Sequence, residues 1–266
     1  MKALRIANII TLLIMLGANA LASVTDVIGG QPTAEVSDRF PTLFTPAGYV
    51  FSIWGVIYVG LIAFAAYQAR NAPEADRVVR RIGPWFAINA VLNAAWLFFW
   101  GYELFWLSVA VMLGILITLI VIYERLGIGR TPAAMGEHWL VRVPFSIYLG
   151  WISVATVANV SVALVASGFD GYLPGNILGP QYWFVLMVTI ATVLGLLGAI
   201  WRRDAAFGLV FVWAFAGIAV NLGPQPEYAY LDLFVSIAAV IVAVGVVIGL
   251  VRRARQSSVV EQEPSV

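Results

Sequence analysis

Tryptophan and asparagine recur at helical spacing in apolar stretches of this chain. Asn89, Asn93 and Trp96 are separated by four and three residues, so amides and an indole share one face of a helix. Indole rings stack on flat aromatic molecules, and carboxamides hydrogen-bond to polar edges. The chemistry that this pattern predicts is the binding of a hydrophobic ligand.

Two further stretches carry similar stripes. Aromatic, small or amide side chains repeat there at intervals of three or four residues: Trp54 and Tyr58 in one stretch, and Tyr148, Trp151, Ala155 and Asn159 in the other. Such faces point towards neighbouring helices in a membrane, so the three stripes are expected to line one pocket. The alternative is packing, in which Asn93 and Asn159 form interhelical hydrogen bonds worth about 0.6 to 2 kcal/mol each. Spacing alone is compatible with both interpretations.

The elements that must position these residues are membrane-spanning helices. Hydrophobic residues make up 62% of the 266 residues, charged residues 11%, and the mean hydropathy is +0.92. About 20 apolar residues cross a hydrocarbon core about 30 Å thick, and lipid offers backbone groups no hydrogen-bond partner. We therefore predict an all-α, polytopic membrane bundle with eight spans, at residues 4–22, 48–69, 83–100, 105–123, 140–166, 181–201, 205–222 and 231–251.

The basic residues predict how this bundle is oriented. With eight spans, all 15 Lys and Arg residues except Arg39 fall on one side of the membrane. Basic residues in short loops stay cytoplasmic, so both termini are predicted to be inside, in a multi-pass protein of a bacterial plasma membrane. Because the basic residues are spread over several segments, nucleic-acid binding has no support. Membrane lipid is an expected partner.

Two segments near the N-terminus allow alternatives. The first span ends in the small-residue stretch 18–22, which also fits a cleavable signal peptide. Its length and the polar Asn8 and Asn19 favour a retained helix that faces protein neighbours. The long segment 23–47 is rich in Gly, Pro, Thr and acidic residues, and we predict that it caps a cavity. An ordinary exposed connector is the alternative.

Helix packing must stabilise this bundle, because the chain has no Cys and therefore no disulfide. Small residues inside spans let helix backbones approach closely. We expect this role for glycines in five of the apolar stretches: Gly60, Gly114, Gly150, Gly195 and Gly198.

The sequence offers little for catalysis or metal binding. Its one His, His138, is expected to be a solvated interfacial residue in a loop just before the fifth span, and single residues make no metal site. The spans contain few ionisable residues, which weakens the case for an ion-coupled transporter, and no phosphate-binding glycine motif occurs. We predict that the protein is not an enzyme and that it requires no cofactor.

The stripes resemble motifs of the TspO/MBR family, the tryptophan-rich sensory or translocator proteins. The segment from Tyr148 to Asn159 is similar to the family's fifth-helix signature, with Trp three, Ala seven and Asn eleven residues after the Tyr. Leu92-Asn93-x-x-Trp96 is similar to its third-helix motif, and residues 46–58 to its first loop and second helix. The chain departs from the pattern at Ser52-Ile53, where the family usually has Gly-Pro-Val.

The resemblance covers about the first 168 residues and implies a fold. Residues 1–168 would form a five-helix TspO-like bundle, and residues 169–253 would add three spans that have no counterpart in the family. Residues 254–266 are predicted to form a disordered cytoplasmic tail. The family also uses a helix surface for dimers, so the resemblance allows a homodimer.

The resemblance also implies a ligand cavity that opens toward the loop between the first two helices. Family members use it for flat hydrophobic molecules, so a porphyrin or another tetrapyrrole is the expected ligand. The predicted site joins the matched positions to two neighbouring tyrosines: Trp54, Tyr58, Asn93, Trp96, Tyr148, Trp151, Ala155 and Asn159.

The expected function is ligand binding with a sensing or regulatory role. A permease-like carrier for a lipophilic metabolite is one alternative, and it would be recognised by flux into proteoliposomes that depends on Trp54 or Trp151. A porphyrin-modifying enzyme is another, and it would be recognised by product formation with the purified protein.

Overall fold

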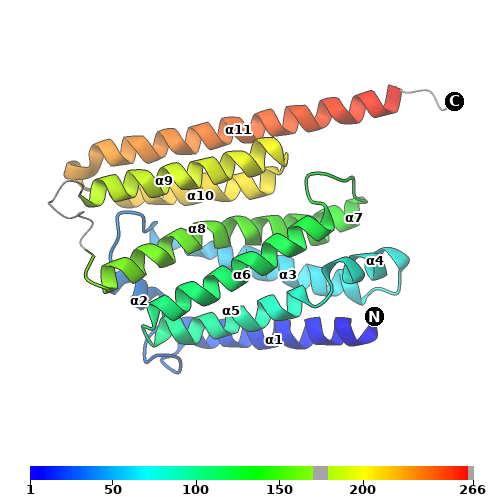
Figure 1. Cartoon of the computed structure of the whole chain (residues 1–266), viewed down its shortest axis with the longest axis horizontal. Coiled ribbons are helices and arrows are strands. Elements are labelled where there is room, and N and C mark those ends of the chain that lie inside the picture. Colours follow the sequence, from blue (N-terminus) through cyan, green and yellow to red (C-terminus); the bar gives the residue numbers. More distant parts are fainter. Residues whose placement is uncertain (170–178, 263–266) are drawn as a thin grey trace.

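The computed structural model describes residues 1–169 and 179–262, and the regular structure within these ranges is helical. The long helices form two groups that lie side by side (Figure 1). The first group holds α1 (Lys2–Val24), α3 (Ile53–Ala69), α5 (Trp85–Gly101), α6 (Phe105–Leu126) and α8 (Val143–Ala166). The second holds α9 (Pro180–Leu196), α10 (Ala205–Leu222) and α11 (Ala229–Gln262). The predicted all-α bundle is confirmed.

Shorter helical elements precede, extend or connect the long helices. They are α2 (Thr33–Arg39), the 3-10 turn η1 (Gly48–Ser52), α4 (Pro73–Ile82), α7 (Met135–Glu137), the π-helical turns η2 (His138–Arg142) and η3 (Leu197–Trp201), and the 3-10 turn η4 (Pro226–Tyr228). Several of them continue directly into a long helix, so the spans exceed the individual helices in length.

Seven stretches of the described chain are long and apolar enough to cross a bilayer: Lys2–Val24, Gly48–Ala69, Phe105–Leu126, Met135–Ala166, Pro180–Trp201, Ala205–Leu222 and Pro226–Arg255. The pair α4 and α5 passes the same test together, although the two helices are bent by 57° at the break between them. Counting this pair as one broken span gives the predicted total of eight.

The connection between the second and third predicted spans contains an amphipathic helix, α4, which the span pattern does not predict. This helix begins with Pro73, which suits a first turn, and it ends before Gly83, whose φ is 61°. Its apolar residues recur at intervals of three and four, and all of them are buried: Ala75, Val78, Val79 and Ile82. This spacing was the signal for an amphipathic helix.

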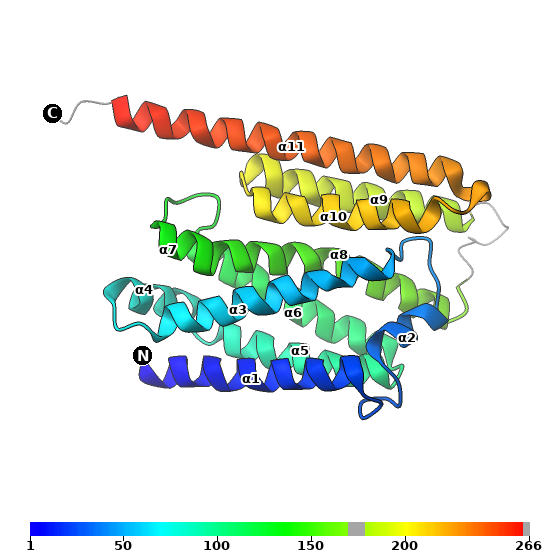
Figure 2. The ribbon, with the colours of Figure 1, turned by 180° about the vertical axis from the view of Figure 1, so that it is seen from behind.

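Both termini lie at the same end of the molecule (Figures 1 and 2). An even number of crossings requires this arrangement. Arg39, the basic residue expected on the other side, forms an ion pair with Glu103 in the connection between α5 and α6. The short helix α2, which contains Arg39, lies at the end away from the termini (Figure 2).

The last helix differs from its prediction. α11 continues to Gln262, so most of the segment 254–266 is helical, where a disordered tail is the expectation. Residues 263–266 lie outside the described residues.

α1 is a packed member of the bundle, in contact with α3 and α5. Leu12 and Met15 are buried in the core, and Asn8 and Asn19 are buried as well. The prediction that these two polar residues face protein neighbours is confirmed.

All five glycines lie close to residues of a neighbouring helix, and Gly150 shows the predicted close approach of helix backbones. A Cβ atom at Gly198 would lie 2.1 Å from Cδ1 of Phe207, and one at Gly60 would lie 2.9 Å from Cβ of Pro144. At Gly150 the nearest atom is the carbonyl oxygen of Phe207, at 3.1 Å, so this residue lets α8 approach α10. For Gly114 and Gly195 the nearest side-chain atoms are at 3.2 Å.

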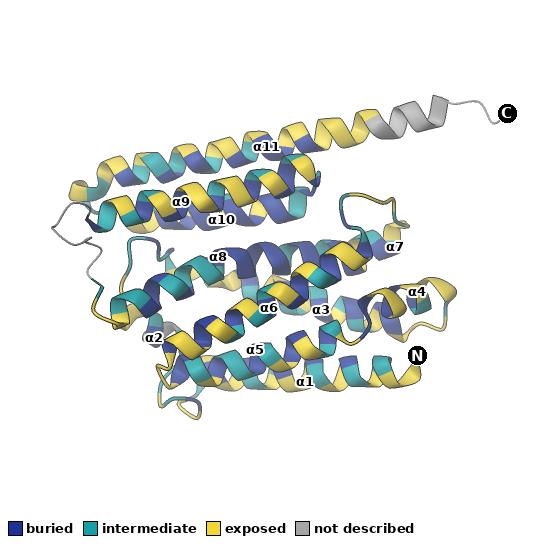
Figure 3. Ribbon diagram, in the orientation of Figure 1, coloured by how far each residue is buried: buried dark blue, intermediate teal, exposed yellow. Residues whose placement is uncertain are grey.

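α8 lies between the two helix groups, and it is buried along much of its length (Figure 3). At one end, Asp204 connects the groups. Its Oδ2 accepts hydrogen bonds from the hydroxyl groups of Tyr123 (2.8 Å) and Ser146 (2.6 Å), which belong to α6 and α8. Its Oδ1 accepts from the backbone N–H of Phe207 at 3.2 Å and so caps α10. One buried carboxylate therefore ties α10 to the first group.

Asp204→Ala is expected to lower the free energy of unfolding by at least about 3 kcal/mol. Hydrogen bonds to a charged group contribute about 1.5–3 kcal/mol each, and loss of a cap costs about 1 kcal/mol more. Unfolding of the purified protein in detergent would measure the loss. Asp204→Asn, which can still cap the helix, should lose less, and the exposed Asp26→Ala should stay within about 0.5 kcal/mol of the parent. Equal stability of Asp204→Ala and Asp26→Ala would contradict this account.

Candidate functional site

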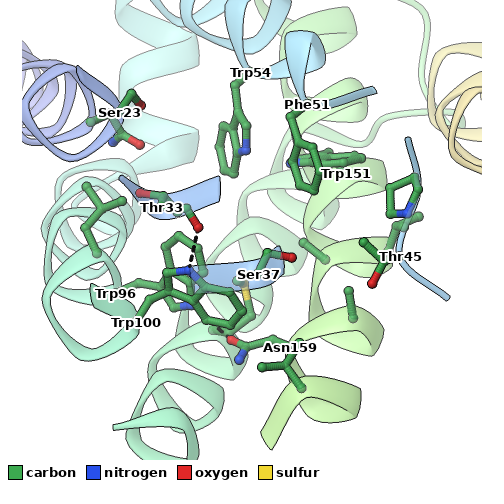
Figure 4. A pocket seen from close by; sticks show the side chains of 18 of the residues that line it. Ser23, Thr33, Ser37, Thr45, Phe51, Trp54, Trp96, Trp100, Trp151 and Asn159 are labelled. Atoms are coloured by element: carbon green, nitrogen blue, oxygen red, sulfur yellow. Dashed lines mark hydrogen bonds between the residues drawn. The ribbon is translucent and has the colours of Figure 1, made fainter. Parts of the chain in front are cut away.

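A cavity of about 260 Å³ lies within the first helix group, beneath the connection between α1 and α3. Its walls come from α1, α2, α3, α5, α6 and α8, from η1 and from the segment before η1. The lining residues are Asn19, Ser23, Thr33, Ser37, Phe44, Thr45, Pro46, Phe51, Trp54, Tyr58, Trp96, Leu97, Trp100, Met112, Trp151, Val154, Ala155, Ala158, Asn159 and Val162. In Figure 4 the tryptophans of three different helices surround one hollow.

The structure brings the three predicted stripes together. The predicted residues that line the cavity come from α3, α5 and α8: Trp54, Tyr58, Trp96, Trp151, Ala155 and Asn159. Helices that are far apart in sequence therefore present their aromatic faces to one space.

Asn93 and Tyr148 are the two predicted site residues that do not line the cavity. Both are buried, and the side-chain amide of Asn93 donates to the hydroxyl of Tyr148 at 2.9 Å. Asn93 Oδ1 accepts from the amide of Asn19 at 2.8 Å, and Asn19 Oδ1 accepts from the hydroxyl of Tyr58 at 2.6 Å. The packing interpretation is therefore correct for Asn93. This network supports the cavity wall from behind, because Asn19 and Tyr58 line the cavity.

Asn159 is both a lining residue and an interhelical link. Its Oδ1 accepts from Nε1 of Trp96 at 2.9 Å, and its amide donates to the hydroxyl of Ser108 on α6 at 2.9 Å. These two hydrogen bonds fix the side-chain amide of Asn159. The main effect of Asn159 is therefore to hold the Trp96 ring at the cavity surface.

Trp100 is a lining residue that the sequence pattern does not single out. It lies near the end of the predicted third span, where tryptophans usually anchor in the membrane interface, but the ring is buried and stacks on Trp96 with centroids 5.3 Å apart. Its Nε1 donates to the backbone carbonyl of Thr33 in α2, at 3.1 Å (Figure 4). The spacing of four between the two tryptophans was the available signal.

The opposite wall is also aromatic. Trp54 stacks on Tyr58 with centroids 5.6 Å apart, and it meets Trp151 edge-on at 6.2 Å. Phe51 meets Trp151 edge-on at 5.8 Å. The indole N–H of Trp151 is buried and has no hydrogen-bond partner. A buried donor without a partner is uncommon, and a ligand with an acceptor atom would satisfy it.

The segment 23–47 contributes to the cavity wall, in keeping with its predicted capping role. Thr33 and Ser37 from α2 line the cavity, as do Phe44, Thr45 and Pro46. Phe44 is buried, although it lies in a connection between spans. The sequence does not identify these individual residues as part of the lining, because their positions depend on how the connection between α1 and α3 folds back over the bundle.

The cavity is suited to stacking and to a few hydrogen bonds. None of its lining residues is Asp, Glu, Lys, Arg or His. The described residues contain no group of three or more His, Cys, Asp or Glu side chains able to hold a metal ion. His138 lies in η2, which is not among the elements that line the cavity, and its ring contacts Trp139.

A protein-family model described as TSPO-like protein matches residues 5–252. The match runs through α9, α10 and most of α11, so the expectation that the last three spans lack a counterpart in the family is corrected. No match was found among curated proteins or among solved structures. Because the family match covers most of the chain, this multi-pass membrane protein belongs to the family of TSPO-like proteins.

Proposed function

We propose that this protein binds a flat, hydrophobic ligand in the cavity between α1, α3, α5 and α8, and that binding serves a sensing or regulatory role. The observation that carries the proposal is the convergence of four tryptophans on one uncharged space: Trp54, Trp96, Trp100 and Trp151. Ligand sites are mostly apolar and aromatic, with a small number of polar groups that fix orientation. The cavity has this composition.

The volume of the cavity limits the size of the ligand that it can enclose. Pockets for small molecules usually enclose about 300–1,000 Å³, and this one encloses about 260 Å³. A tetrapyrrole is larger than this cavity, so it would insert part of its ring between the indoles and keep its outer edge near the connection that contains Thr33 and Thr45. Polar substituents on that edge would meet the hydroxyl groups of the mouth, while the unpartnered N–H of Trp151 would donate to an acceptor deeper inside.

The lining residues favour binding over catalysis or ion-coupled transport. General acid–base chemistry needs a side chain that exchanges a proton near the working pH, and ion coupling needs ionisable groups at membrane depth. The polar side-chain groups in the cavity lining are hydroxyl, amide and indole groups. A carrier without ion coupling is the second candidate, and flux of a lipophilic dye into proteoliposomes that is lost in Trp54→Ala would favour it.

The orientation of the protein in the membrane and its assembly into a homodimer remain predictions. The shared end of the two termini, which is also rich in Arg, is proposed to be cytoplasmic. A homodimer would use a lipid-facing helix surface.

Tetrapyrrole binding is expected to quench the intrinsic tryptophan fluorescence of the purified protein saturably. Trp151→Phe should weaken the apparent affinity about fivefold to tenfold, because it removes the free indole N–H and part of the stacking area. Asn93→Ala should weaken it less, because it acts through the network that ends at Tyr58. A titration against tetrapyrroles, sterols and carotenoids would identify the ligand class.

Trp201→Phe is the matched control for this titration. Its ring is 71% exposed and lies outside the cavity, so the substitution removes one fluorophore without touching the site. Weak, non-saturating quenching that is the same in Trp151→Phe, Asn93→Ala and Trp201→Phe would leave packing as the role of the stripes.

A further inference from the structure

We propose that α10, which lies outside the cavity, positions the segment Thr45–Val50 that forms part of the cavity wall. The second helix group would then be a functional part of the ligand site. This inference rests on the proposed ligand binding and adds to it the residues that determine how firmly the site is closed.

Three hydrogen bonds join α10 to the backbone of this segment. Ala47 N–H donates to the carbonyl oxygen of Gly217 at 3.0 Å. Trp213 Nε1 donates to the carbonyl oxygen of Val50 at 3.1 Å, and Asn221 Nδ2 donates to that of Thr45 at 3.0 Å.

The three α10 residues that make these bonds are spaced by four, at positions 213, 217 and 221, so they lie on one face of the helix. This face holds the segment by its main chain. The contact therefore does not depend on which side chains the segment presents to the cavity.

Gly217 permits this approach. A Cβ atom there would lie 2.0 Å from Cγ2 of Val50 and 3.3 Å from Cβ of Pro46, so a side chain at position 217 would collide with Val50 and push the segment away from α10 as long as Val50 is present. Val50 is fully buried, and Tyr49 meets the Trp213 ring edge-on at 5.4 Å. The segment is seated against α10 rather than lying loosely over it.

The same segment contributes residues to the cavity on its other side. Thr45 and Pro46 line the cavity, as do the flanking residues Phe44 and Phe51, whereas no residue of α10 does. The α10 face is therefore a positioning surface. Release of the segment from α10 would open the part of the wall that Thr45 and Pro46 form, and a bound ligand would lose part of its enclosure.

The test combines two mild substitutions in α10, Trp213→Phe and Asn221→Ala. Both side chains are exposed, so the fold should survive their replacement. The double variant is expected to bind a tetrapyrrole about tenfold more weakly, the size expected for the loss of two neutral hydrogen bonds. Val220→Ala, an exposed position on the same helix, is the matched control and should bind like the parent.

An engineered disulfide between the segment and α10 should restore the ligand affinity of the double variant. It would not do so if the two substitutions acted by damaging the fold elsewhere. The chain has no Cys, so Val50→Cys with Gly217→Cys introduces the only two thiols. A Cβ atom at Gly217 lies 3.3 Å from that of Val50, close to the range of about 3.5–4.5 Å found in disulfides. Oxidation of this pair in the Trp213→Phe, Asn221→Ala background should restore binding to within about twofold of the parent, and reduction should abolish the rescue.

Thiol labelling separates the failure of this inference from the failure of the proposed function. Without any ligand, a maleimide should label Val50→Cys at least about tenfold faster in the Trp213→Phe, Asn221→Ala background than in the parent background. If the parent binds no tetrapyrrole, the proposed function fails, while the labelling rate still reports whether α10 holds the segment. Unchanged labelling, or unchanged affinity in the double variant of a parent that binds, overturns the inference.

Discussion

Ala155→Phe is expected to abolish ligand binding while leaving the fold intact. Ala155 lines the cavity, and an aromatic ring there would occupy much of the available 260 Å³. A ligand would have to displace this ring into packed surroundings, and overpacking costs about 1–3 kcal/mol, with more lost through the missing contact area. We expect the affinity to fall at least about 30-fold, measured by saturable fluorescence quenching.

Two controls make this result specific to the cavity. Ala155→Ser adds one heavy atom and should bind nearly like the parent. Val91→Phe adds comparable bulk on α5, at a position that is 53% exposed and outside the cavity, and it should have no effect on affinity. If Ala155→Phe folds normally and binds the ligand as tightly as Val91→Phe, the cavity is not the binding site.

Arg142→Met is expected to lower the free energy of unfolding by about 3–5 kcal/mol. Arg142 and Glu137 form a buried ion pair, in which Nε of Arg142 donates to Oε1 of Glu137 at 2.8 Å. Nη1 of Arg142 also donates to the backbone carbonyl of Thr131 at 2.6 Å. Removal of the guanidinium leaves a buried carboxylate without its counter-charge, and this is the costly outcome for a buried pair. Thermal unfolding in detergent would measure the loss.

The double variant Arg142→Met, Glu137→Met tests whether the uncompensated charge of Glu137 causes this loss of stability. Replacing both members of a buried ion pair with apolar residues is often close to neutral, so the double variant should be more stable than Arg142→Met alone. A double-mutant cycle gives the interaction free energy directly. Additive losses in the cycle would show that the two side chains contribute independently.

Much of the bundle could be predicted because the relevant information is local. A run of apolar residues long enough to cross a bilayer forms a helix for lack of any other backbone partner, and helical spacing places Trp96 and Asn93, or Trp151 and Ala155, on one face. The missed helix α4 also had a local signal, in the spacing of Val78 and Ile82.

The cavity needed contacts between residues that are far apart in the chain. Asn19 and Asn93 are separated by 74 residues, and their hydrogen bond removes Asn93 from the lining. Trp213 and Val50 are separated by 163 residues, and their contact seats part of the wall. Periodicity reports which side of a helix a residue occupies, but not which neighbour that side meets.

The sequence by itself determined that this protein is a bundle of membrane helices with aromatic and amide stripes, since both features follow from composition and from the 3.6-residue repeat. Only the tertiary structure decided which members of the stripes face an open space and which, like Asn93 and Tyr148, are buried behind it. It also decided that the connection through Phe44 and Pro46 completes the wall, with α10 behind it. The physical reason is that an enclosed void depends on the relative placement of several helices, and no single stretch of chain specifies that placement.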